Sequence, residues 1–214
     1  MKKFKNIIFD FDGVVLDSVA IKNKVFSKTV SGYNKIIQKK FINFHLNNLG
    51  LSRYYKYEFL CRKLLKLKTT QYLKKKLVDD YSKILNKEIK NTKYIKGIKK
   101  FIIKNKEKNL FISSGTPQKE LRKICSERKI SKYFLKILGS PKTKYQHLKY
   151  LKNKYKFSKN NTVFFGDAVA DFNAAKKYDL TFIQVGKNMK NSKIKLKIKD
   201  FRDKKIQKYF NKRS

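Results

Sequence analysis

The amino-acid sequence indicates an α/β protein, in which a parallel sheet core is interrupted after its first strand by an all-helical insertion. In the second half of the chain, short apolar runs alternate with segments of helical periodicity, as is typical of parallel sheets with helices on both faces. Between about residues 19 and 93, helical periodicity recurs without a convincing strand. We therefore expect a core domain made of residues 1–18 and 94–214 and a helical domain made of residues 19–93.

The strands of this core should be five short runs rich in β-branched and aromatic residues. They span residues 5–11, 109–114, 133–140, 161–167 and 180–186. The helices expected around them span residues 97–107, 118–130, 144–156, 171–178 and 199–212. Within the insertion we expect helices over residues 19–30, 33–49, 53–67 and 71–87, separated by Gly32, Gly50 and Thr69–Thr70.

The charge of the chain is extreme, because 56 Lys and Arg against 15 Asp and Glu give a formal net charge of +41. Such a charge is typical of nucleic-acid partners, so a nucleic-acid-binding or end-processing protein is one alternative. Only six of the basic residues are arginine, the side chain best suited to bidentate phosphate and base recognition. The lysines are also spread along the whole chain. We favour a lysine-rich solvated surface that attracts small anions, and we do not expect a nucleic-acid partner.

The sequence indicates neither a disulfide framework nor a membrane partner. Cys61 and Cys125 have no metal-type spacing and should be small buried hydrophobes in a reducing compartment. After MKKFKNIIF, Asp10 and Asp12 interrupt the apolar run before a signal peptide would be complete. No stretch approaches the roughly 18 apolar residues of a membrane helix. We therefore expect a cytoplasmic protein.

The few acidic residues gather after two of the predicted strands. Five of the fifteen lie in two windows that total thirteen residues, where uniform scattering over 214 positions would place about one. They are Asp10, Asp12, Asp17, Asp167 and Asp171. In an open parallel sheet, ligands bind beyond the carboxyl ends of the strands, and converging carboxylates there suit Mg²⁺ that shares its shell with a phosphate. Asp17 begins the first inserted helix, so we expect it to cap that helix or to form a hinge.

Four short motifs, in this order along the chain, resemble those of the haloacid dehalogenase (HAD) superfamily. The first is DFDGVV, which begins at Asp10 and is followed by Asp17. Ser114–Gly115 then ends the second strand, a lysine follows the third strand in GSPKTK, and GDAVAD spans residues 166–171. The resemblance covers residues 1–18 and 97–186 and implies a Rossmann-like core. The helical insertion sits where the cap domain of that superfamily does.

The resemblance assigns roles that phosphoryl transfer requires, namely a nucleophile, an acid/base and charge neutralisation. It implies that Asp10 attacks phosphorus and forms an aspartyl-phosphate, while Asp12 protonates the leaving alcohol and then activates water. It also implies a Mg²⁺ site at Asp10, the backbone carbonyl of Asp12, and Asp167. Asp171 would support that site, either directly or by bonding the lysine of the third motif.

The phosphate itself should lie near the second and third motifs. The resemblance implies that the Ser114 hydroxyl and the Gly115 amide hold phosphate oxygens at a helix start, where the dipole favours anions. Lys142 or Lys144 would neutralise Asp10 and the transferring phosphate. We prefer Lys144, because Pro141 directly precedes Lys142 and the helix should begin slightly later.

An aspartate at position 12 bears on the reaction, because dehalogenases of the superfamily lack this acid/base and phosphatases and phosphomutases retain it. The resemblance therefore implies a Mg²⁺-dependent phosphatase of a small phosphorylated metabolite, similar to phosphoglycolate or sugar-phosphate phosphatases. A phosphomutase resembling beta-phosphoglucomutase is the alternative, because it shares every motif named above.

The most distinctive part of the insertion is GLSRYYKYEFL, residues 50–60. Ser52 is a candidate helix N-cap, and the string resembles cap segments that contact the leaving group in some phosphatases. Arg53 and Lys56 would then contact a second anionic group of the substrate, such as a carboxylate or phosphate. The alternative is a solvated helix face. His45 and His147 lack metal-ligand neighbours in the sequence and are expected to be ordinary helix residues.

Overall fold

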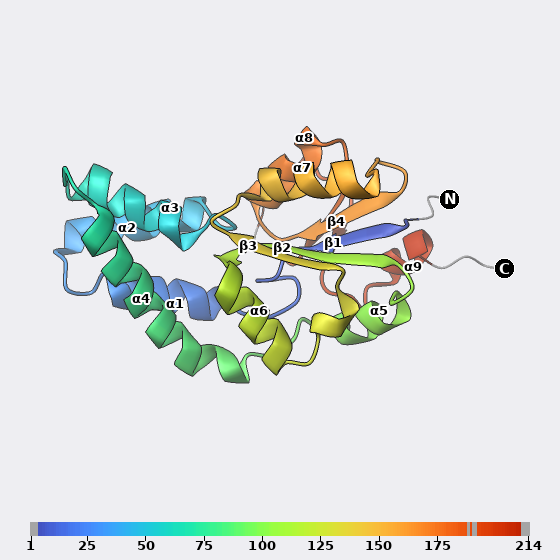
Figure 1. Cartoon of the computed structure of the whole chain (residues 1–214), viewed down its shortest axis with the longest axis horizontal. Coiled ribbons are helices and arrows are strands. Elements are labelled where there is room, and N and C mark those ends of the chain that lie inside the picture. The colour runs from blue at the N-terminus through green and yellow to red at the C-terminus, as the bar shows by residue number, and fades with distance from the viewer. Residues whose placement is uncertain (1–3, 188, 190–191, 211–214) are drawn as a thin grey trace.

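The computed structural model describes residues 4–187, 189 and 192–210. Its centre is a six-stranded sheet of parallel strands in the order β3-β2-β1-β4-β5-β6 (Figure 1). The strands are β1 Asn6–Phe9, β2 Asn109–Pro117, β3 Lys136–Ser140, β4 Thr162–Gly166, β5 Thr181–Val185 and β6 Lys197–Ile198. The predicted α/β class and its five strands are thus confirmed. The sixth was not predicted, because two residues are too few to show a periodicity.

Helices cover both faces of this sheet, with α7 and α8 on one face and α5 and α6 on the other (Figure 1). The core helices are α5 Ile98–Lys104, α6 Gln118–Glu127, α7 Lys144–Tyr155, α8 Val169–Lys177 and α9 Lys204–Phe210. Helix α9 begins later than predicted, and the last predicted positions, 211 and 212, lie outside the described residues. One-turn 3₁₀ helices, Ile89–Asn91 and Ser131–Tyr133, lie in the connections.

Alternate residues of β1 serve the two faces, as the twofold period of a strand requires. Ile7 and Phe9 join the apolar cluster that includes Phe101 of α5 and Leu121 of α6. Ile8, between them, joins a second cluster on the opposite face. The second cluster includes Phe111, Leu148, Phe164, Ala174 and Ala175. A strand buried on both faces cannot accommodate exposed charges, so the aspartates begin only where the strand ends.

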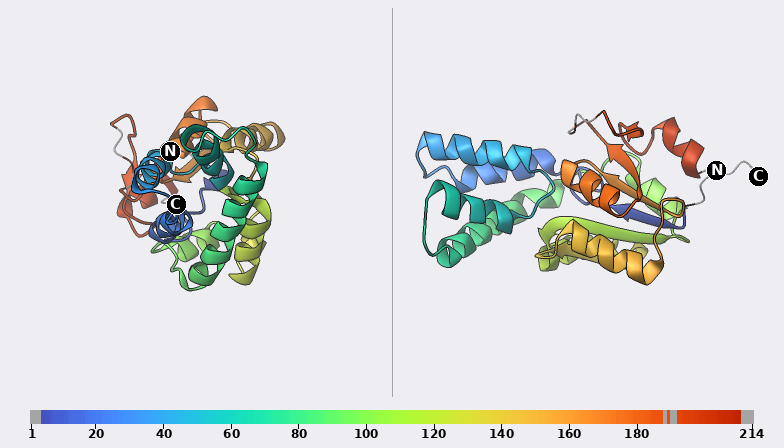
Figure 2. Two further views of the ribbon diagram at one scale, coloured as in Figure 1. Left: turned by 90° about the vertical axis from the view of Figure 1, so that its left-hand side faces the viewer. Right: turned by 90° about the horizontal axis from the view of Figure 1, so that it is seen from above.

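The helical segment, Val19–Glu88, lies beyond one end of the sheet (Figures 1 and 2). It contains α1 Val19–Thr29, α2 Lys35–Asn47, α3 Arg53–Phe59, a π-helical turn Leu60–Leu64 and α4 Gln71–Glu88. Four buried aromatic side chains form its centre: Phe26, Phe41, Tyr57 and Tyr81. The helix predicted over residues 53–67 is therefore shorter and ends in a π turn. The candidate N-cap is confirmed, because the Ser52 hydroxyl accepts a hydrogen bond from Tyr55 N at 3.4 Å.

Two stretches of backbone that connect the helical segment to the sheet lie side by side. Asp17 N donates to Lys93 O at 2.9 Å, and Ile95 N donates to Val15 O at 3.0 Å. Asp17 is exposed at this crossing, so it belongs to the connection and not to the cluster of aspartates. None of the described helices is both long and apolar enough to cross a bilayer.

Candidate active site

Asp10 and Asp167 lie close together because the strands before them pair. Phe9 of β1 is in register with Phe165 of β4, so the residues that follow these two strands leave the sheet at the same edge. The loop after β1 passes directly over Asp167, since a Cβ on Gly13 would lie 2.2 Å from the Asp167 Oδ2 atom. Gly13 also has a φ of 77°, a conformation that favours glycine. The glycine of the first motif is therefore required both by its φ and by its contact with Asp167.

Lys144 lies at the centre of the aspartate cluster. Its Nζ atom is 2.8 Å from Asp10 Oδ2 and also pairs with Asp171 Oδ1. Asp171 accepts a second bond from the backbone N–H of Ala168. The sequence left open whether Asp171 supports the metal site directly or bonds the lysine of the third motif, and the structure shows the contact with the lysine. Lys142 is exposed, whereas Lys144 is buried as the first residue of α7, whose N-cap Thr143 forms a capping box with Gln146.

The cluster holds three carboxyl groups and one described cation. Burial, with the neighbouring Asp171, raises the pKa of Asp10 to about 8, although Lys144 opposes the shift. Burial alone would lower the pKa of Lys144, but Asp10 and Asp171 outweigh it and raise that pKa. Lys144 therefore stays charged. Asp10, Asp167 and Asp171 each offer an oxygen within 4.8 Å of the others, so the donor set fits a hard divalent cation that would balance the charge.

Asp12 points away from this cluster and is held by three donors. Its Oδ1 atom accepts from the Ser18 hydroxyl at 2.5 Å, and its Oδ2 atom is bonded to Lys22 Nζ at 2.5 Å and to the Thr116 hydroxyl at 3.0 Å. Burial opposes ionisation of Asp12, but Lys22 and the three hydrogen bonds outweigh it and lower the pKa. Asp12 is therefore a carboxylate of fixed orientation beside the pocket.

The second motif lies at the end of β2, between the sheet and the helical segment. Ser114 is buried, and its hydroxyl accepts from Thr116 N at 3.1 Å. A Cβ on Gly115 would lie 2.8 Å from the carbonyl oxygen of Gly50, so a side chain there would displace the loop between α2 and α3. Helix α6 begins only at Gln118, three residues after Gly115.

Arg53 and Lys56 are both buried, and both face the same pocket from α3. Arg53 makes a two-pronged ion pair with Glu120 of α6, with N···O distances of 2.9 and 2.6 Å. It also donates to the Ser82 hydroxyl at 2.9 Å and lies 4.1 Å from the centre of the Tyr81 ring. Arg53 thus joins the helical segment to the core, and the predicted solvated helix face is wrong for these two residues.

Lys56 has a different set of partners. Its Nζ atom lies 2.9 Å from His45 Nδ1, and His45 Nε2 lies 2.8 Å from Asn23 Oδ1. The ammonium group is also 5.0 Å from the centre of the Phe26 ring. Burial lowers the pKa of Lys56 to about 7, with Lys22 adding to the shift, and burial together with Lys56 lowers the pKa of His45 to about 3. His45 is therefore a neutral acceptor for Lys56.

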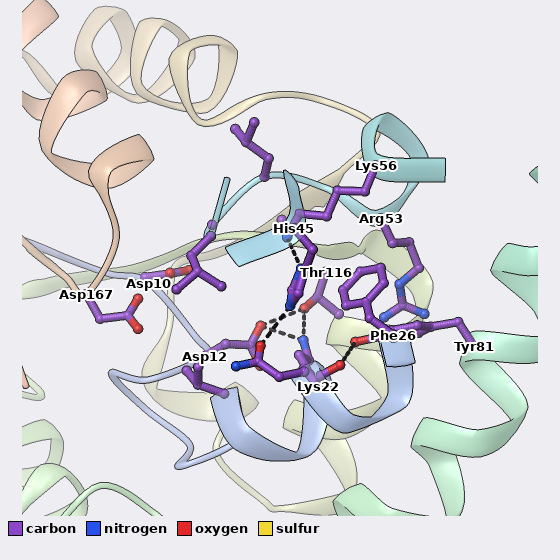
Figure 3. A pocket seen from close by; sticks show the side chains of 16 residues that line it. Asp10, Asp12, Lys22, Phe26, His45, Arg53, Lys56, Tyr81, Thr116 and Asp167 are labelled. Atoms are coloured by element: carbon purple, nitrogen blue, oxygen red, sulfur yellow. Dashed lines mark hydrogen bonds and ion pairs between the residues drawn. The ribbon is translucent and has the colours of Figure 1, made fainter. Parts of the chain in front are cut away.

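These groups surround one cavity of about 70 Å³ between the sheet and the helical segment (Figure 3). Its core side holds Asp10, Asp12, Asp167, Gly115 and Thr116. Its helical side holds Lys22, Asn23, Phe26, His45, Arg53, Lys56 and Tyr81. The cavity therefore brings together residues that are far apart in the sequence.

Sequence reasoning missed Lys22, Thr116, Asn23 and His45. A lysine carries little signal in so basic a chain, although Thr116 could have been noticed as a hydroxyl two residues after Ser114. His45 was expected to be an ordinary helix residue, but it lines the cavity. His147 lies outside that lining and bonds Ser113 Oγ at 3.0 Å and the Gly139 carbonyl at 3.1 Å.

A family model described as haloacid dehalogenase-like hydrolase matches residues 7–185 of this chain. The chain belongs to the haloacid dehalogenase-like hydrolase family. The match covers all but the first residue of β1, strands β2 to β5, the four motifs and the helical segment, and it confirms the predicted resemblance and the prediction of a hydrolase. No curated protein sequence matches the chain.

The chain also resembles solved structures over nearly its whole length. A predicted phosphoglycolate phosphatase from Haemophilus somnus is 19% identical with a TM-score of 0.73, over 98% of this chain and 99% of that one. A beta-phosphoglucomutase candidate from Thermotoga maritima is 17% identical with a TM-score of 0.64, over 96% and 99%. CbbY from Rhodobacter sphaeroides, solved in complex with phosphate, is 13% identical with a TM-score of 0.70, over 94% and 96%. At such identities the likeness shows the fold alone.

Proposed function

We propose that this hydrolase is a Mg²⁺-dependent phosphatase of a small phosphorylated metabolite, acting through an aspartyl-phosphate on Asp10. The observation that carries the proposal is the meeting of Asp10 and Asp167 at the carboxyl ends of neighbouring strands, where both line one small cavity and Asp10 pairs with Lys144. Asp10 is a buried carboxyl group 2.8 Å from the Lys144 ammonium group, and Lys144 together with the proposed Mg²⁺ would favour its ionised form, the nucleophile that must approach an anionic phosphate.

The remaining groups of the core side supply the other requirements of phosphoryl transfer. Asp12 is two residues beyond the nucleophile, and its carboxylate is suited to accept a proton from water, while its protonated form would give a proton to the leaving group. Lys144 would neutralise charge on the transferring phosphoryl group, which Ser114 and Gly115 would help to hold. Asp10, the carbonyl of Asp12, and Asp167 would hold Mg²⁺, which supplies further charge neutralisation when bound.

We propose that the helical segment acts as a cap over this chemistry. Gly50 closely approaches Gly115, and Arg53 is paired with Glu120, so the helical segment contacts the core at two places beside the cavity. A cavity of about 70 Å³ is too small for large substrates, and closure of a cap over it would exclude bulk water. This favours a small phosphorylated metabolite over a nucleic acid, despite the charge of the chain.

The test is turnover of p-nitrophenyl phosphate by the wild type and Asp10→Asn. We expect Asp10→Asn to abolish turnover while the circular dichroism spectrum stays unchanged, because an amide cannot form the acyl phosphate. EDTA should inhibit the wild type, and added Mg²⁺ should restore its activity. Retained turnover in Asp10→Asn would refute the assignment of Asp10 as the nucleophile. Activity that EDTA leaves intact would refute the dependence on a metal ion.

A phosphomutase is the second candidate, favoured by the likeness in fold to the Thermotoga maritima protein. The two reactions differ in whether water or a sugar hydroxyl accepts the phosphoryl group from Asp10. A panel of hexose 1-phosphates separates them, because a phosphatase releases inorganic phosphate and a mutase yields the isomeric sugar phosphate.

A further inference from the structure

A second cavity, of about 400 Å³, lies between α5 and α9, at the end of the molecule away from the helical segment (Figure 1). We call it the α5–α9 cavity. Among the described residues, it shares no lining residue with the catalytic cavity. Its apolar part is formed by four side chains: Phe101, Phe201, Ile206 and Phe210. A largely apolar cavity of this size with a few polar groups is typical of small-molecule sites.

The apolar floor of the α5–α9 cavity is held in place by the sheet. The centre of the Phe101 ring lies 5.1 Å from that of Phe201 and 5.0 Å from that of Phe210. Phe101 and Phe201 also pack against Phe165 of β4, with ring centres 5.5 and 5.1 Å apart. A floor fixed in this way needs little rearrangement to accept a ligand. Because aromatic rings favour tilted and edge-to-face contacts at such distances, the floor suits a further ring.

The polar lining of the α5–α9 cavity is mostly cationic. Lysines are common throughout this chain, so their presence alone does not indicate a site, but here their spacing places them together. Lys100 and Lys104 are four residues apart on α5 and share one face of the helix, and Lys108 follows at the same interval. Like charges at this spacing repel each other. An anion between them would offset that repulsion.

The other charged groups of the lining do not cancel this positive charge. Arg202 pairs with Asp200 at 2.8 Å, so its charge is balanced outside the cavity. Asp203 is the one carboxylate among the described lining residues, and it stands against three lysines. Lys108 also lies over the Phe210 ring, 4.7 Å from its centre. The positive groups and the aromatic floor are therefore neighbours, as a ligand with a ring and an acidic group would require.

We propose that the α5–α9 cavity is a second ligand site, which binds a small aromatic carboxylate. The ring would lie on Phe101 and Phe201, and the carboxylate would lie near Lys100 and Lys104. This inference goes beyond the proposed phosphatase function and does not depend on it, because no group assigned to the reaction lines this cavity.

The first test separates the two parts of the ligand. Isothermal titration of the full chain compares 2-naphthoate with 2-naphthylmethanol, which keeps the ring without the charge, and with acetate, which keeps the charge without the ring. We expect one molecule of 2-naphthoate to bind per chain and the alcohol to bind about tenfold more weakly, as several exposed charge contacts would give. Acetate should bind more weakly still, because it buries little apolar surface. Equal affinity for 2-naphthoate and the alcohol would overturn the proposal.

The second test uses paired lysine variants. Lys100→Gln/Lys104→Gln should weaken 2-naphthoate binding about fivefold and leave the binding of the alcohol unchanged. Lys83→Gln/Lys87→Gln is the matched control, since these lysines are also exposed and four residues apart, on α4. The control should bind 2-naphthoate like the wild type. Equal losses in the two double variants would show general attraction to a basic surface and would refute the site.

The third test places the ligand. In heteronuclear NMR spectra, 2-naphthoate should shift the amide signals of Gly97 and Asn105, which line the α5–α9 cavity, and leave that of Gly115 unchanged. Shifts centred on Gly115, or displacement of 2-naphthoate by inorganic phosphate in Mg²⁺, would assign the ligand to the catalytic cavity and contradict a second site. Since no turnover is measured, the result stands whether or not the protein is a phosphatase.

Discussion

The two sides of the cavity are built in different ways. On the core side, short carboxylate side chains leave the ends of paired strands, and Lys144 lies 2.8 Å from Asp10. On the helical side, long side chains from separate helices meet. Lys22 and Arg53 pair with the core residues Asp12 and Glu120, whereas Lys56 contacts the neutral His45. The core side is thus suited to fixed chemistry and the helical side to recognition.

This difference follows from what holds each side in place. Asp10 and Asp167 directly follow β1 and β4, and the backbone hydrogen bonds between these strands fix where the two residues lie relative to each other. Arg53 and Lys56 are held by aromatic packing and by side-chain contacts, which small substitutions can change. Substitutions on the core side should therefore abolish the reaction, whereas those on the helical side should change its substrate range.

The largest effect on the core side is expected for Lys144→Met. Removal of the ammonium group leaves Asp10 and Asp171 buried without their cation, which should lower the free energy of unfolding by about 3 kcal/mol and lower kcat by about a hundredfold or more. Urea unfolding and p-nitrophenyl phosphate kinetics measure the two effects. Lys142→Met is the matched control, since Lys142 is exposed two residues away. Equal losses in both variants would mean that the loop, and not the ammonium group, matters.

The contrast also explains what could be predicted from the sequence. Asp10, Asp12 and Asp167 could be found because parallel strands end at one edge, so local patterns fix positions that are far apart in the chain. Lys144 could be chosen over Lys142 from the position of Pro141. Partners such as Lys22 and His45 could not be found in this way, because the packing of separate helices decides which side chains meet.

The role of Glu120 shows the same limit. It is an ordinary acidic residue in the first turn of α6, and only the tertiary structure brings it to Arg53. The contact of Arg53 with the substrate stays a prediction, and the structure adds a partner from the core that the sequence of the helical segment does not indicate.

A smaller effect is expected on the pH dependence of stability in the metal-free protein, and it arises from Asp10 on the core side. Burial and Asp171 raise the pKa of Asp10 to about 8 in the folded protein, from 3.8 for an aspartate that is fully solvated, as in the unfolded chain. Between these values the folded state holds a proton that the unfolded chain has released, so the stability of metal-free protein should fall as pH rises. At the proposed metal site, Mg²⁺ would oppose this loss of stability by binding the ionised form of Asp10.

The increase in Tm on adding Mg²⁺ should therefore be larger at about pH 8 than at about pH 5. Differential scanning fluorimetry of EDTA-treated wild type and Asp10→Asn measures it. Asp10→Asn should show a smaller increase that depends less on pH. An increase of the same size at both pH values in the wild type would contradict the assignment of Asp10 to the metal.

The smallest effect is expected for Glu120→Gln, which weakens the link between the helical segment and the core. The Arg53 side chain is only 3% exposed, and its charge would lose its carboxylate. We expect KM for p-nitrophenyl phosphate to rise about threefold, from roughly 0.6 kcal/mol of weakened closure, with little change in kcat. Glu127→Gln, on the same helix but exposed, is the control and should leave KM unchanged.

Glu120→Gln also sharpens the distinction between the two cations of α3. If Arg53 only joins the helical segment to the core, the variant raises KM equally for 2-phosphoglycolate and for 2-hydroxyethyl phosphate. If Arg53 also binds the substrate, release from Glu120 exposes a guanidinium group to the cavity and increases the preference for 2-phosphoglycolate. We expect the first result, because Ser82 and the Tyr81 ring still hold Arg53 in place, and a rise in that preference would return Arg53 to the substrate site.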